Sequence, residues 1–384
     1  MLRLHNPIKQ LQNITIRYYS STTLDSEVLF ETKGKCLNVT LNRPKALNSL
    51  NSNMVKILTP KYLEMKKSLK DGDMVVVMKG AGDKSFCAGG DIRAIYDIGK
   101  QTDQNTPKES DGDFFREEYM LNQLIGTNTI PQVSIYNGFA MGGGIGVSIH
   151  GKFRVATENT VFAMPETGIG FFCDVGGSYF LSRLPNHMGM YLALTGAKLK
   201  GKNVRVTGVA THYVPNAQVP QLQQELETLS NPTEANVKAV LDKFSENVDI
   251  NDKSLDVVQH LETIKRCFSK SSVEDIIASL EKEGTDWSKQ TVNTLKSVSP
   301  TSLKVVYEQL QRGKSLSLDE CLKMEYRMSQ VFVRNNDFFE GVRALLVDKD
   351  KNPKWTPPTL SEVSNNTVQS YFQPLNAKKE LKFF

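Results

Sequence analysis

The sequence predicts an α/β protein that begins with a largely parallel β-sheet and ends in a region made mostly of helices. Up to about residue 218, short apolar and β-branched runs alternate with helix-like segments, an order that favours parallel strands joined by helices. Residues 74–78 are continuously apolar, which is typical of a strand buried on both faces of a sheet. From residue 219 on, amphipathic helical patterns dominate. We therefore expect a core at 24–218 and a helical region at 219–384 that packs on it.

Each expected element rests on a local signal. Strands at 28–31 and 36–41 flank the Lys-Gly-Lys turn at 33–35, and Asn51 is placed to cap a helix that runs to about Leu69. The polar stretch 99–113 predicts a flexible surface loop. The remaining expected elements are strands at 74–78 and 132–136 and helices at 92–98, 114–124, 175–184, 189–194, 257–268, 273–283, 302–311 and 318–333.

Composition excludes several classes of protein. The chain has 384 residues, of which 39% are hydrophobic and 23% charged, as is ordinary for one large or two medium-sized globular domains. The net charge of +5 is modest and no block of lysine and arginine stands out, so we expect no nucleic-acid partner. No apolar run approaches the length that spans a bilayer, so we expect no membrane partner. Nothing in the sequence fixes the oligomeric state.

The cysteines and histidines predict neither a disulfide framework nor a metal site. The five cysteines are scattered and form no Cys-x-x-Cys pair, which favours free thiols in a reducing compartment. The five histidines lack metal-ligand spacing such as His-x-x-x-His, so we expect no bound metal.

The first 23 residues differ from the rest of the chain. They contain Arg3, Lys9 and Arg17 but no acidic residue, and they end in a Ser-Ser-Thr-Thr run. A basic, hydroxyl-rich leader without a secretory apolar region is typical of a mitochondrial transit peptide. The alternative is a disordered N-terminus. Removal of the three positive charges lowers the net charge from +5 to +2.

Two glycine-containing turns are the strongest candidates for a functional site. Gly142, Gly143 and Gly144 lie between a strand-like run and a helix-like run, and Gly89 and Gly90 follow a similar pattern. A backbone without Cβ approaches a ligand closely, and the first N–H groups of a helix have no intrahelical partner. If each turn aims one N–H at the same oxygen, the pair forms an oxyanion hole. The structural alternative is a tight turn with close helix–sheet packing.

Other catalytic motifs fail on spacing. A dinucleotide fingerprint needs a glycine where the chain has Val147 or Ile149, and no phosphate loop ending in Gly-Lys-Ser/Thr is present. Ser148 and His150 resemble part of a nucleophile elbow, but two residues apart on a helix they point to different sides. Cys173 has no evident activating histidine, so we expect it to be a buried apolar residue.

Dispersed motifs resemble a known family. Ser-Phe-Cys-Ala-Gly-Gly-Asp-Ile at 85–92 and Asn-Gly-Phe-Ala-Met-Gly-Gly-Gly at 137–144 resemble the enoyl-CoA hydratase/isomerase (crotonase) superfamily. The resemblance extends over 28–355, and it implies a spiral of ββα turns, an acyl-CoA substrate and no separate cofactor. The stretches that resemble one branch in particular, the 3-hydroxyisobutyryl-CoA hydrolases, are 114–119, 162–167, 174–177, 343–350 and 353–355.

The resemblance implies roles for residues at the two turns and downstream of them. Gly90 and Gly143 would supply the oxyanion-hole N–H groups, with Glu166 as the catalytic carboxylate. Asp174 would be the partner of Glu166, and Glu118 would lie near the acyl group. The other implied substrate contacts are Arg43, Lys45 and Ala46, in the segment expected to contact CoA, and Ala88, Asp91 and Ile92 beside the first glycine turn.

The acidic and basic residues also have structural alternatives. Glu166 follows Pro165 and would suit a helix N-terminus, whereas Asp174 and Asp91 are placed to cap the helices after them. Glu118 would then lie on a solvated helix face, and the basic residues on ordinary surface.

The implied reaction is hydrolysis of 3-hydroxyisobutyryl-CoA in mitochondrial valine catabolism, with other small 3-hydroxyacyl-CoA thioesters as further candidates. A hydratase of the superfamily places a second glutamate three residues after the oxyanion glycine, where this chain has Gly146. Glu166 would act as nucleophile or as general base, and the sequence leaves both open. An enoyl-CoA hydratase or isomerase and a non-enzymatic acyl-CoA-binding protein remain as alternatives.

Overall fold

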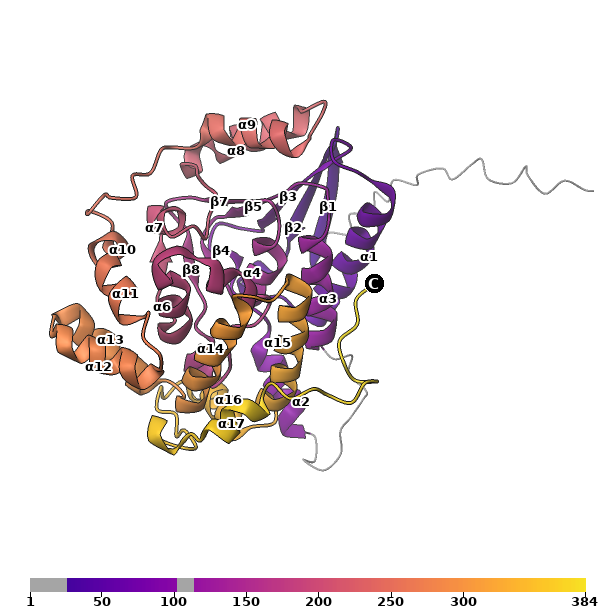
Figure 1. Cartoon of the computed structure of the whole chain (residues 1–384). Helices are drawn as coiled ribbons and strands as arrows, with labels where there is room; N and C mark the ends of the chain where they lie inside the picture. The colour runs from indigo at the N-terminus through magenta and orange to yellow at the C-terminus, as the bar shows by residue number, and fades with distance from the viewer. Residues whose placement is uncertain (1–25, 102–113) are drawn as a thin grey trace, which may run out of the picture.

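Figure 1 presents the computed structural model of the chain, which describes residues 26–101 and 114–384. Two β-sheets lie in the middle of the fold and helices surround them. The predicted transit peptide at 1–23 lies outside the described residues. Among the helices that the structure describes, none combines the length and the apolarity that a membrane crossing requires.

Within the described residues the larger sheet has six strands, and it is parallel apart from one edge. β1 (Val28–Lys33) pairs antiparallel with β2 (Cys36–Leu41), and the chain reverses through Gly34, whose φ is +57°. The predicted hairpin is therefore confirmed, with a first strand two residues longer than expected. The strands that follow across the sheet, each parallel to its neighbours, are β3 (Val75–Gly80), β5 (Gln132–Tyr136), β7 (Phe153–Ala156) and β10 (His212–Tyr213).

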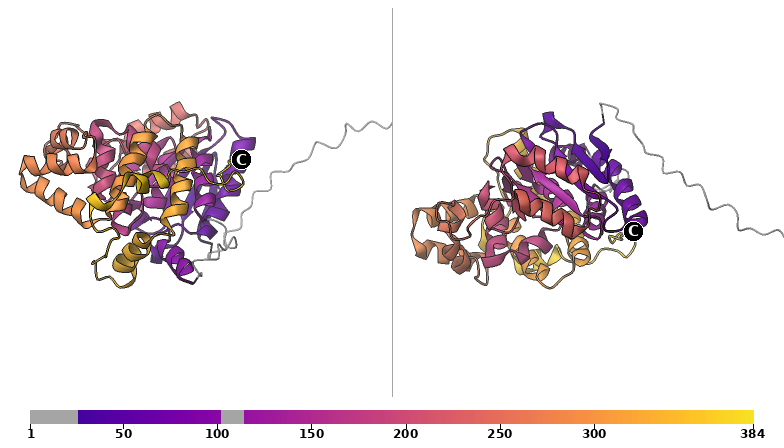
Figure 2. Two further views of the ribbon diagram at one scale, coloured as in Figure 1. Left: turned by 60° about the horizontal axis from the view of Figure 1, so that its bottom comes forward. Right: turned by 90° about the horizontal axis from the view of Figure 1, so that it is seen from above.

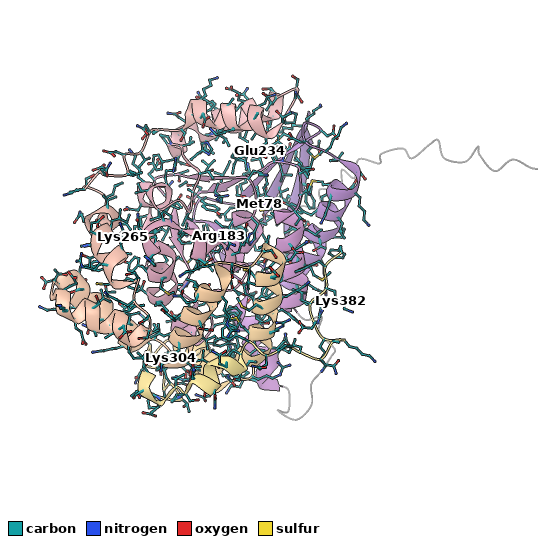
Figure 3. The ribbon with its side chains drawn as sticks, viewed as in Figure 1. Met78, Arg183, Glu234, Lys265, Lys304 and Lys382 are labelled. Atoms are coloured by element: carbon teal, nitrogen blue, oxygen red, sulfur yellow. The ribbon has the colours of Figure 1, made fainter. Side chains whose placement is uncertain are left out.

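The strand predicted at 74–78 forms from Val75 on and is buried on both faces, whereas Met74 precedes it and is partly buried. Val75 and Val77 of β3 pack with apolar residues of α8 (Val219–Thr228) and α9 (Glu234–Phe244), which lie over one face of the sheet (Figure 2). Val76 and Met78 belong to the larger core on the opposite face. Figure 3 shows Met78 in the middle of the packed side chains, with Lys304 and Lys382 towards the outside.

The smaller sheet positions the candidate site. Its strand order among the described residues is β4 (Ser85–Cys87), β6 (Phe139–Met141), β8 (Val161–Ala163) and β9 (Leu199–Lys200). β4 and β6 are parallel neighbours, with Ser85 opposite Phe139. The same ends of parallel neighbours meet at one edge of a sheet. The glycine turn after β4 and the glycine turn after β6 therefore lie together.

The helices of the first half form largely where the sequence predicts them. Asn51 Oδ1 accepts a hydrogen bond of 2.9 Å from the Met54 N–H, so the predicted helix cap is confirmed. The helices of this half are α1 (Ser52–Ser68), α2 (Ile92–Gln101), α3 (Phe114–Gly126), α4 (Gly142–Ile149), α5 (Gly177–Phe180), α6 (Met188–Thr195) and α7 (Lys202–Val206).

The helical character after residue 219 is confirmed. Phe332 of α15 stacks on Phe172 at a ring distance of 5.1 Å, so the late helices share a core with the first half of the chain. The domain boundary at 218/219 stays a prediction. After α8 and α9 come α10 (Asp256–Gln259), α11 (Leu261–Cys267), α12 (Val273–Glu283), α13 (Asp286–Ser297), α14 (Pro300–Gly313), α15 (Leu318–Phe332), α16 (Asn336–Val342) and α17 (Asn365–Ser370).

Two predicted boundaries around the glycine turns are wrong. The unpredicted strand β6 lies between β5 and the triple glycine, because three residues are too few to produce a recognisable alternation. α2 continues to Gln101 and so enters the predicted loop 99–113, of which residues 102–113 lie outside the described part of the chain.

Two predicted helices are interrupted. The helix expected at 175–184 begins only at Gly177, because Val175 and Gly176 have left-handed φ angles of +53° and +85°. It then tightens into the 3₁₀ turn η3 (Leu181–Arg183). The helix expected at 257–268 is divided at His260 into α10 and α11.

Candidate active site

The two glycine turns touch each other. A Cβ built on Gly143 would lie 3.1 Å from the Gly90 nitrogen, and one built on Gly142 would lie 3.4 Å from the Gly89 Cα. Gly89 and Gly142 also have positive φ angles of +113° and +43°. Only glycine combines this backbone conformation with so close an approach. The predicted convergence of the two turns is therefore present in the structure.

Two N–H groups at this contact lack a backbone acceptor. α4 begins at Gly142, so the Gly143 N–H is one of the first helical donors and has no intrahelical partner. The first turn is fixed by hydrogen bonds of 2.8 Å from Leu50 N to Gly89 O and from Asp91 N to Leu50 O. In the described residues, neither the Gly90 nor the Gly143 N–H donates to a loop, turn or side-chain acceptor. Both donors are therefore available to a ligand oxygen.

Two buried glutamates flank the glycine contact. Glu118, on α3, is 1% exposed, and its Oε1 lies 2.6 Å from the Cβ position of Gly143. Glu166 is 7% exposed and begins the 3₁₀ turn η2 (Glu166–Ile169); its Oε1 lies 3.2 Å from the Cβ position of Gly142. Glu118 Oε1 and Glu166 Oε2 have no hydrogen-bond partner in the described structure. The solvated-face alternative for Glu118 is therefore wrong.

Asp174 is the third buried acid of the site, at 6% exposed. Its Oδ2 accepts a 2.9 Å hydrogen bond from the hydroxyl of Tyr119, a fully buried residue of α3. The helix that follows is capped by Gly176, and Asp174 contributes only its backbone carbonyl to that turn. The capping alternative for the Asp174 side chain is therefore wrong, and the carboxylate faces α3.

Burial controls the protonation of these acids. Desolvation, and after it the negative charge of Asp174, raises the pKa of Glu166 to about 8. Desolvation raises the pKa of Asp174 to about 7, although the hydrogen bond from Tyr119 opposes the shift. The pKa of Glu118 is raised by burial and then by the charge of Asp174. Burial therefore brings the pKa values of Glu166 and Asp174 close to neutral pH, a range that suits acid–base chemistry.

A fourth buried acid fixes the chain just after Asp174. Glu325, on α15, is fully buried, and its carboxylate accepts hydrogen bonds from Gly176 N at 2.7 Å and from Ser178 N at 2.8 Å and Oγ at 2.6 Å. Gln309 Nε2, on α14, donates to the Cys173 carbonyl at 2.7 Å. The late helices thus clamp the segment on both sides of Asp174. The pKa of Glu325 is raised to about 8, again mainly by burial.

Sequence reasoning missed Tyr119, Glu325 and Gln309. Each lies inside a correctly predicted helix. The available signal was a polar residue on an otherwise apolar helix face: Glu325 follows Leu322 by three residues and precedes Phe332 by seven. That signal marks burial but does not indicate which residues the side chain contacts.

The basic segment expected to contact CoA adjoins the first glycine turn. The Arg43 guanidinium forms ion pairs of 3.1 Å with Glu27 and with Asp91, and it donates to Ser49 O at 2.6 Å. The Asp91 carboxylate therefore pairs with Arg43, and no cap from this side chain to α2 is found among the described residues. Lys45 is exposed.

The other predicted contact residues lie beside the same turn. The Ala88 N–H donates to Leu47 O at 3.1 Å, which joins the Arg43–Lys45 segment to the strand end before Gly90. Ile92 Cδ1 lies 3.8 Å from the Cβ position of Gly90. Ala46 is partly exposed in the 3₁₀ turn that follows Arg43. The predicted site residues therefore gather in one region, with Lys45 at its surface.

Gly146 has no room for a side chain. A Cβ there would lie 2.6 Å from Val175 Cβ and 3.0 Å from Asn122 Nδ2. A glutamate at this position would require movement of the segment that follows Asp174. The second carboxylate that a hydratase places here is thus excluded by both sequence and packing.

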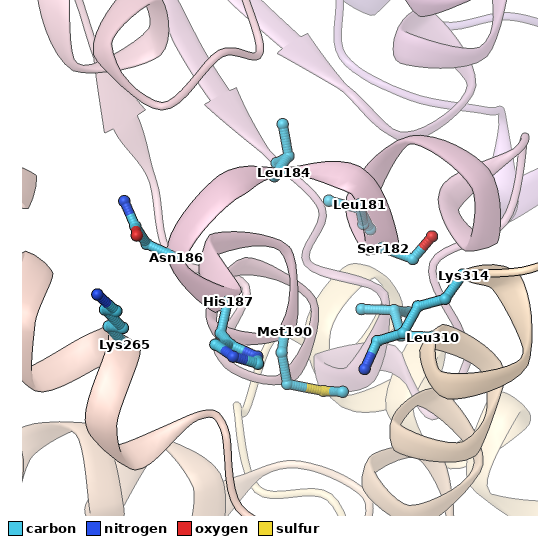
Figure 4. Close-up of a pocket in the computed structure, with 9 residues that line it drawn as sticks. All are labelled: Leu181, Ser182, Leu184, Asn186, His187, Met190, Lys265, Leu310 and Lys314. Carbon is cyan, nitrogen blue, oxygen red and sulfur yellow. The ribbon is translucent and has the colours of Figure 1, made fainter.

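Two surface cavities differ in their relation to the site. A cavity of about 430 Å³ includes Asp91 and Phe114, and Phe114 Cε1 lies 3.6 Å from the Cβ position of Gly90. A cavity of about 280 Å³ between α6, α11 and α14, shown in Figure 4, includes His187 and Lys265 but none of the predicted site residues. The first cavity therefore adjoins the candidate site and the second does not.

Metal-ligating groups do not gather in the described structure. Within residues 26–101 and 114–384, no three His, Cys, Asp or Glu side chains are arranged to hold a metal ion. The five cysteines, all in these ranges, are unpaired and buried. Burial raises the pKa of Cys173 well above its usual value, so this thiol is not an activated nucleophile.

Parallel ββα turns with paired glycine amides opposite buried carboxylates define a protein of the crotonase class. The family model for enoyl-CoA hydratase/isomerase matches residues 36–372. The chain therefore belongs to the enoyl-CoA hydratase/isomerase family, as its motifs predicted.

Relatives and solved structures refine this placement. The chain is 63% identical to "3-hydroxyisobutyryl-CoA hydrolase, mitochondrial" of Dictyostelium discoideum over 96% of both chains. It is 44% identical to the protein of that name from Homo sapiens, over 96% of this chain and 94% of the other. A carnitinyl-CoA dehydratase from Mycobacterium thermoresistibile has a TM-score of 0.82 at 37% identity, covering 94% of this chain and 99% of the other. An enoyl-CoA hydratase from Rhodobacter sphaeroides has a TM-score of 0.79 at 31% identity, covering 93% and 100%.

Proposed function

We propose that this chain hydrolyses the thioester of 3-hydroxyisobutyryl-CoA to the free acid and CoA, in mitochondria and as a step of valine catabolism. The observation that carries the proposal is the contact of the Gly90 and Gly143 turns beside the buried carboxylates of Glu166 and Asp174. Curated relatives at 63% and 44% identity carry this activity and the word mitochondrial in their names.

The two glycine amides would bind the thioester carbonyl oxygen. When a nucleophile adds to the carbonyl carbon, this oxygen becomes negative, and preorganised N–H donors stabilise it. Such a donor typically contributes about 3–4 kcal/mol of transition-state stabilisation. The Gly143 donor is buried and the Gly90 donor is half-buried, and hydrogen bonds and packing hold both turns in place, so the donors need not reorganise during the reaction.

Glu166 would supply the reacting carboxylate. As general base it takes a proton from water while the water oxygen bonds to the carbonyl carbon; the C–S bond then breaks and the thiolate receives a proton. As nucleophile its own oxygen bonds to the carbon, CoA leaves, and water cleaves the resulting anhydride. Both routes use the ionised carboxylate: its unpartnered Oε2 is free to react, and a pKa of about 8 makes it a stronger base than an ordinary glutamate while part of it stays ionised near neutral pH.

Asp174 would hold a second, exchangeable proton beside Glu166. Its pKa of about 7 lets it donate or accept a proton at physiological pH, and the hydrogen bond from Tyr119 orients it. Glu118 would face the acyl group next to the Gly143 amide.

CoA would bind along the surface beside the first glycine turn. Lys45 is exposed there and suits a phosphate group, whereas the Arg43 guanidinium is already engaged by two carboxylates. We therefore assign the phosphate contact to Lys45 and a supporting role to Arg43. Ala46, Ala88, Asp91 and Ile92 would border the rest of the bound CoA ester.

Hydration of an enoyl-CoA is the second candidate, because solved relatives at 37% and 31% identity are named as a dehydratase and a hydratase. Addition of water across a double bond needs a second acid–base group, and Gly146 leaves no side chain to provide it.

One assay compares the candidates. The full chain is incubated with 3-hydroxyisobutyryl-CoA while release of the free thiol is recorded, and with crotonyl-CoA while loss of the double bond is recorded. We expect thiol release without hydration. Hydration without thiol release would favour the second candidate, and CoA binding without either reaction would favour a non-enzymatic binding protein.

A further inference from the structure

Asn122 is a buried amide that the mechanism above does not use. It lies on α3, is 0% exposed, and neither its Nδ2 nor its Oδ1 has a hydrogen-bond partner in the described structure. Burying a polar group without a hydrogen-bond partner lowers the stability of the fold, and a hydrophobic residue of similar shape would avoid this loss. The amide therefore needs a partner that the protein itself does not supply.

Asn122 shares a helix face with Glu118, which lies against the Gly143 turn. Asn122 follows Glu118 by four residues, so the two side chains lie on the same face of α3. Glu118 Oε1 lies 2.6 Å from the Cβ position of Gly143, and Asn122 Nδ2 lies 3.0 Å from that of Gly146. Both side chains therefore face α4, with Asn122 one turn further along that helix. Three residues of helix correspond to about 4.5 Å.

The proposed substrate has a polar group at a matching distance. In a 3-hydroxyacyl thioester the hydroxyl oxygen is three single bonds from the carbonyl carbon, and each bond spans about 1.5 Å. With the carbonyl oxygen at the Gly90 and Gly143 amides, the hydroxyl therefore reaches about one helical turn from the oxyanion site. Asn122 lies about that far along α4 from the oxyanion site, and both Glu118 and Asn122 have an unpartnered polar atom on α3.

We propose that Asn122, together with Glu118, binds the hydroxyl group on C3 of the acyl chain and so selects hydroxyacyl over plain acyl thioesters. This inference rests on the proposed thioesterase function. A hydroxyl has one donor and two acceptor positions, whereas an amide offers a donor and an acceptor. Asn122 Nδ2 donates to the hydroxyl oxygen, and Glu118 Oε1, on the same face of α3, accepts from the hydroxyl hydrogen. The match holds for either orientation of the amide.

Energetics explains why this arrangement gives selectivity. A site built to hydrogen-bond a substrate hydroxyl discriminates strongly against the analogue without it, because its polar groups then stay buried and unpaired. Isobutyryl-CoA has the same carbon skeleton without the hydroxyl, so it leaves Asn122 and Glu118 in that unpaired state. The pair of substrates therefore isolates the contribution of this one contact.

The test compares the two thioesters in wild type and in Asn122→Leu. For each protein, kcat/KM is measured by thiol release from 3-hydroxyisobutyryl-CoA and from isobutyryl-CoA, and the ratio of the two values is the readout. We expect Asn122→Leu to reduce the ratio at least ~10-fold, through loss of activity on the hydroxylated substrate alone. Thermal stability should be unchanged or higher, because a buried unpartnered amide is replaced by a methyl-bearing side chain of similar size.

Gln123→Leu is the matched control. Gln123 is the next residue of α3 and is also buried, with an unpartnered Oε1, but its Nε2 donates to Asp319 at 3.2 Å. Its removal deletes a buried amide that faces the C-terminal helices and not α4. We expect equal effects of Gln123→Leu on both thioesters, so the substrate ratio should stay at the wild-type value.

The outcomes separate this inference from the function on which it rests. If the wild type releases thiol from neither thioester, the proposed function fails. If the wild type prefers the hydroxylated substrate and Asn122→Leu keeps the same ratio, the function stands and the role of Asn122 is overturned. An equal loss on both substrates assigns Asn122 to packing and likewise overturns it. If Asn122→Leu does not fold, Asn122→Ala is measured by the same ratio.

Discussion

Glu166 and Glu325 are two buried glutamates close to Asp174, and they differ in how their oxygens are partnered. Burial raises the pKa of each to about 8. Glu325, on the side of α14 and α15, accepts three hydrogen bonds from Gly176 and Ser178. Glu166, beside the start of α4, keeps Oε2 without a partner, as Glu118 on α3 does with Oε1.

The comparison shows that a raised pKa does not by itself identify a catalytic acid. The same desolvation acts on both glutamates, but the carboxylate of Glu325 is used entirely in holding the backbone. The unpartnered oxygens of Glu166 and Glu118 lie instead beside the contact of the two glycine turns. The hydrogen bonds that each carboxylate makes, and not the size of its pKa shift, therefore distinguish the glutamate that holds the backbone from the one that we propose to be catalytic.

The largest expected effect is that of Glu166→Gln. This change keeps the shape of the side chain and removes both its basicity and its nucleophilicity, so kcat should fall about 10²–10⁴-fold. KM should change little, and so should the melting temperature at pH 5, where Glu166 is largely protonated in the folded protein and no protein hydrogen bond to Oε2 is lost. Steady-state thiol release and a thermal melt measure the two quantities. Full activity in this variant would contradict the assignment.

Gly143→Ala should have the next largest effect. The added methyl would meet Glu118 Oε1 at 2.6 Å and the Gly90 nitrogen at 3.1 Å, which pushes the two turns apart. A displacement of this kind typically costs about 10²-fold in kcat/KM. Gly168→Ala is the matched control in the neighbouring 3₁₀ turn, because no atom lies within 4 Å of its Cβ position. Comparable losses in both variants would refute the convergence of the amides on the substrate.

Glu325→Gln should affect stability more than chemistry. The substituted amide cannot accept all three hydrogen bonds, and a buried N–H left without its acceptor costs about 1–3 kcal/mol. Urea unfolding should show this loss, while kcat at 25 °C should stay within about tenfold of wild type because Asp174 keeps its hydrogen bond to Tyr119. A loss of kcat as large as that of Glu166→Gln, without destabilisation, would contradict the distinction between a structural Glu325 and a catalytic Glu166.

The smallest expected effect is on the pH dependence of stability. The folded-state pKa of Glu166, about 8, is above its ordinary value of 4.5. Its contribution to stability is therefore fully present below the ordinary pKa and is lost as pH rises through about 8. Glu166→Gln lacks this ionisation, so its melting temperature relative to wild type should increase from pH 5 to pH 8. A constant difference across that range would show that Glu166 ionises normally in the folded protein.

Much of the fold was predictable because its signals are local. The apolar run in β3, the Asn51 cap and the amphipathic helices after residue 219 each follow from short stretches of sequence. β6 was not predicted because a three-residue strand exists only through pairing with β4 and β8. The interruption before α5 arises from left-handed Val175 and Gly176, and Val175 gives no sequence signal for it.

The candidate site shows the same difference between residues that a local motif marks and residues that only distant contacts distinguish. The glycine turns, Glu166 and Asp174 were found because motifs mark them, and the structure places them together. Their catalytic and binding roles remain proposals. Glu325 and Asn122 were not found, because what distinguishes them is a partner, or the lack of one, on an element far away in the sequence.

The most direct test of the account is thiol release from 3-hydroxyisobutyryl-CoA by wild type, Glu166→Gln and Glu325→Gln, side by side at one pH and below all three melting temperatures. The account predicts turnover by the wild type, turnover within about tenfold of it by Glu325→Gln, and a loss of at least about 10²-fold in Glu166→Gln. An inactive wild type, or a Glu166→Gln variant as active as the wild type, would contradict it.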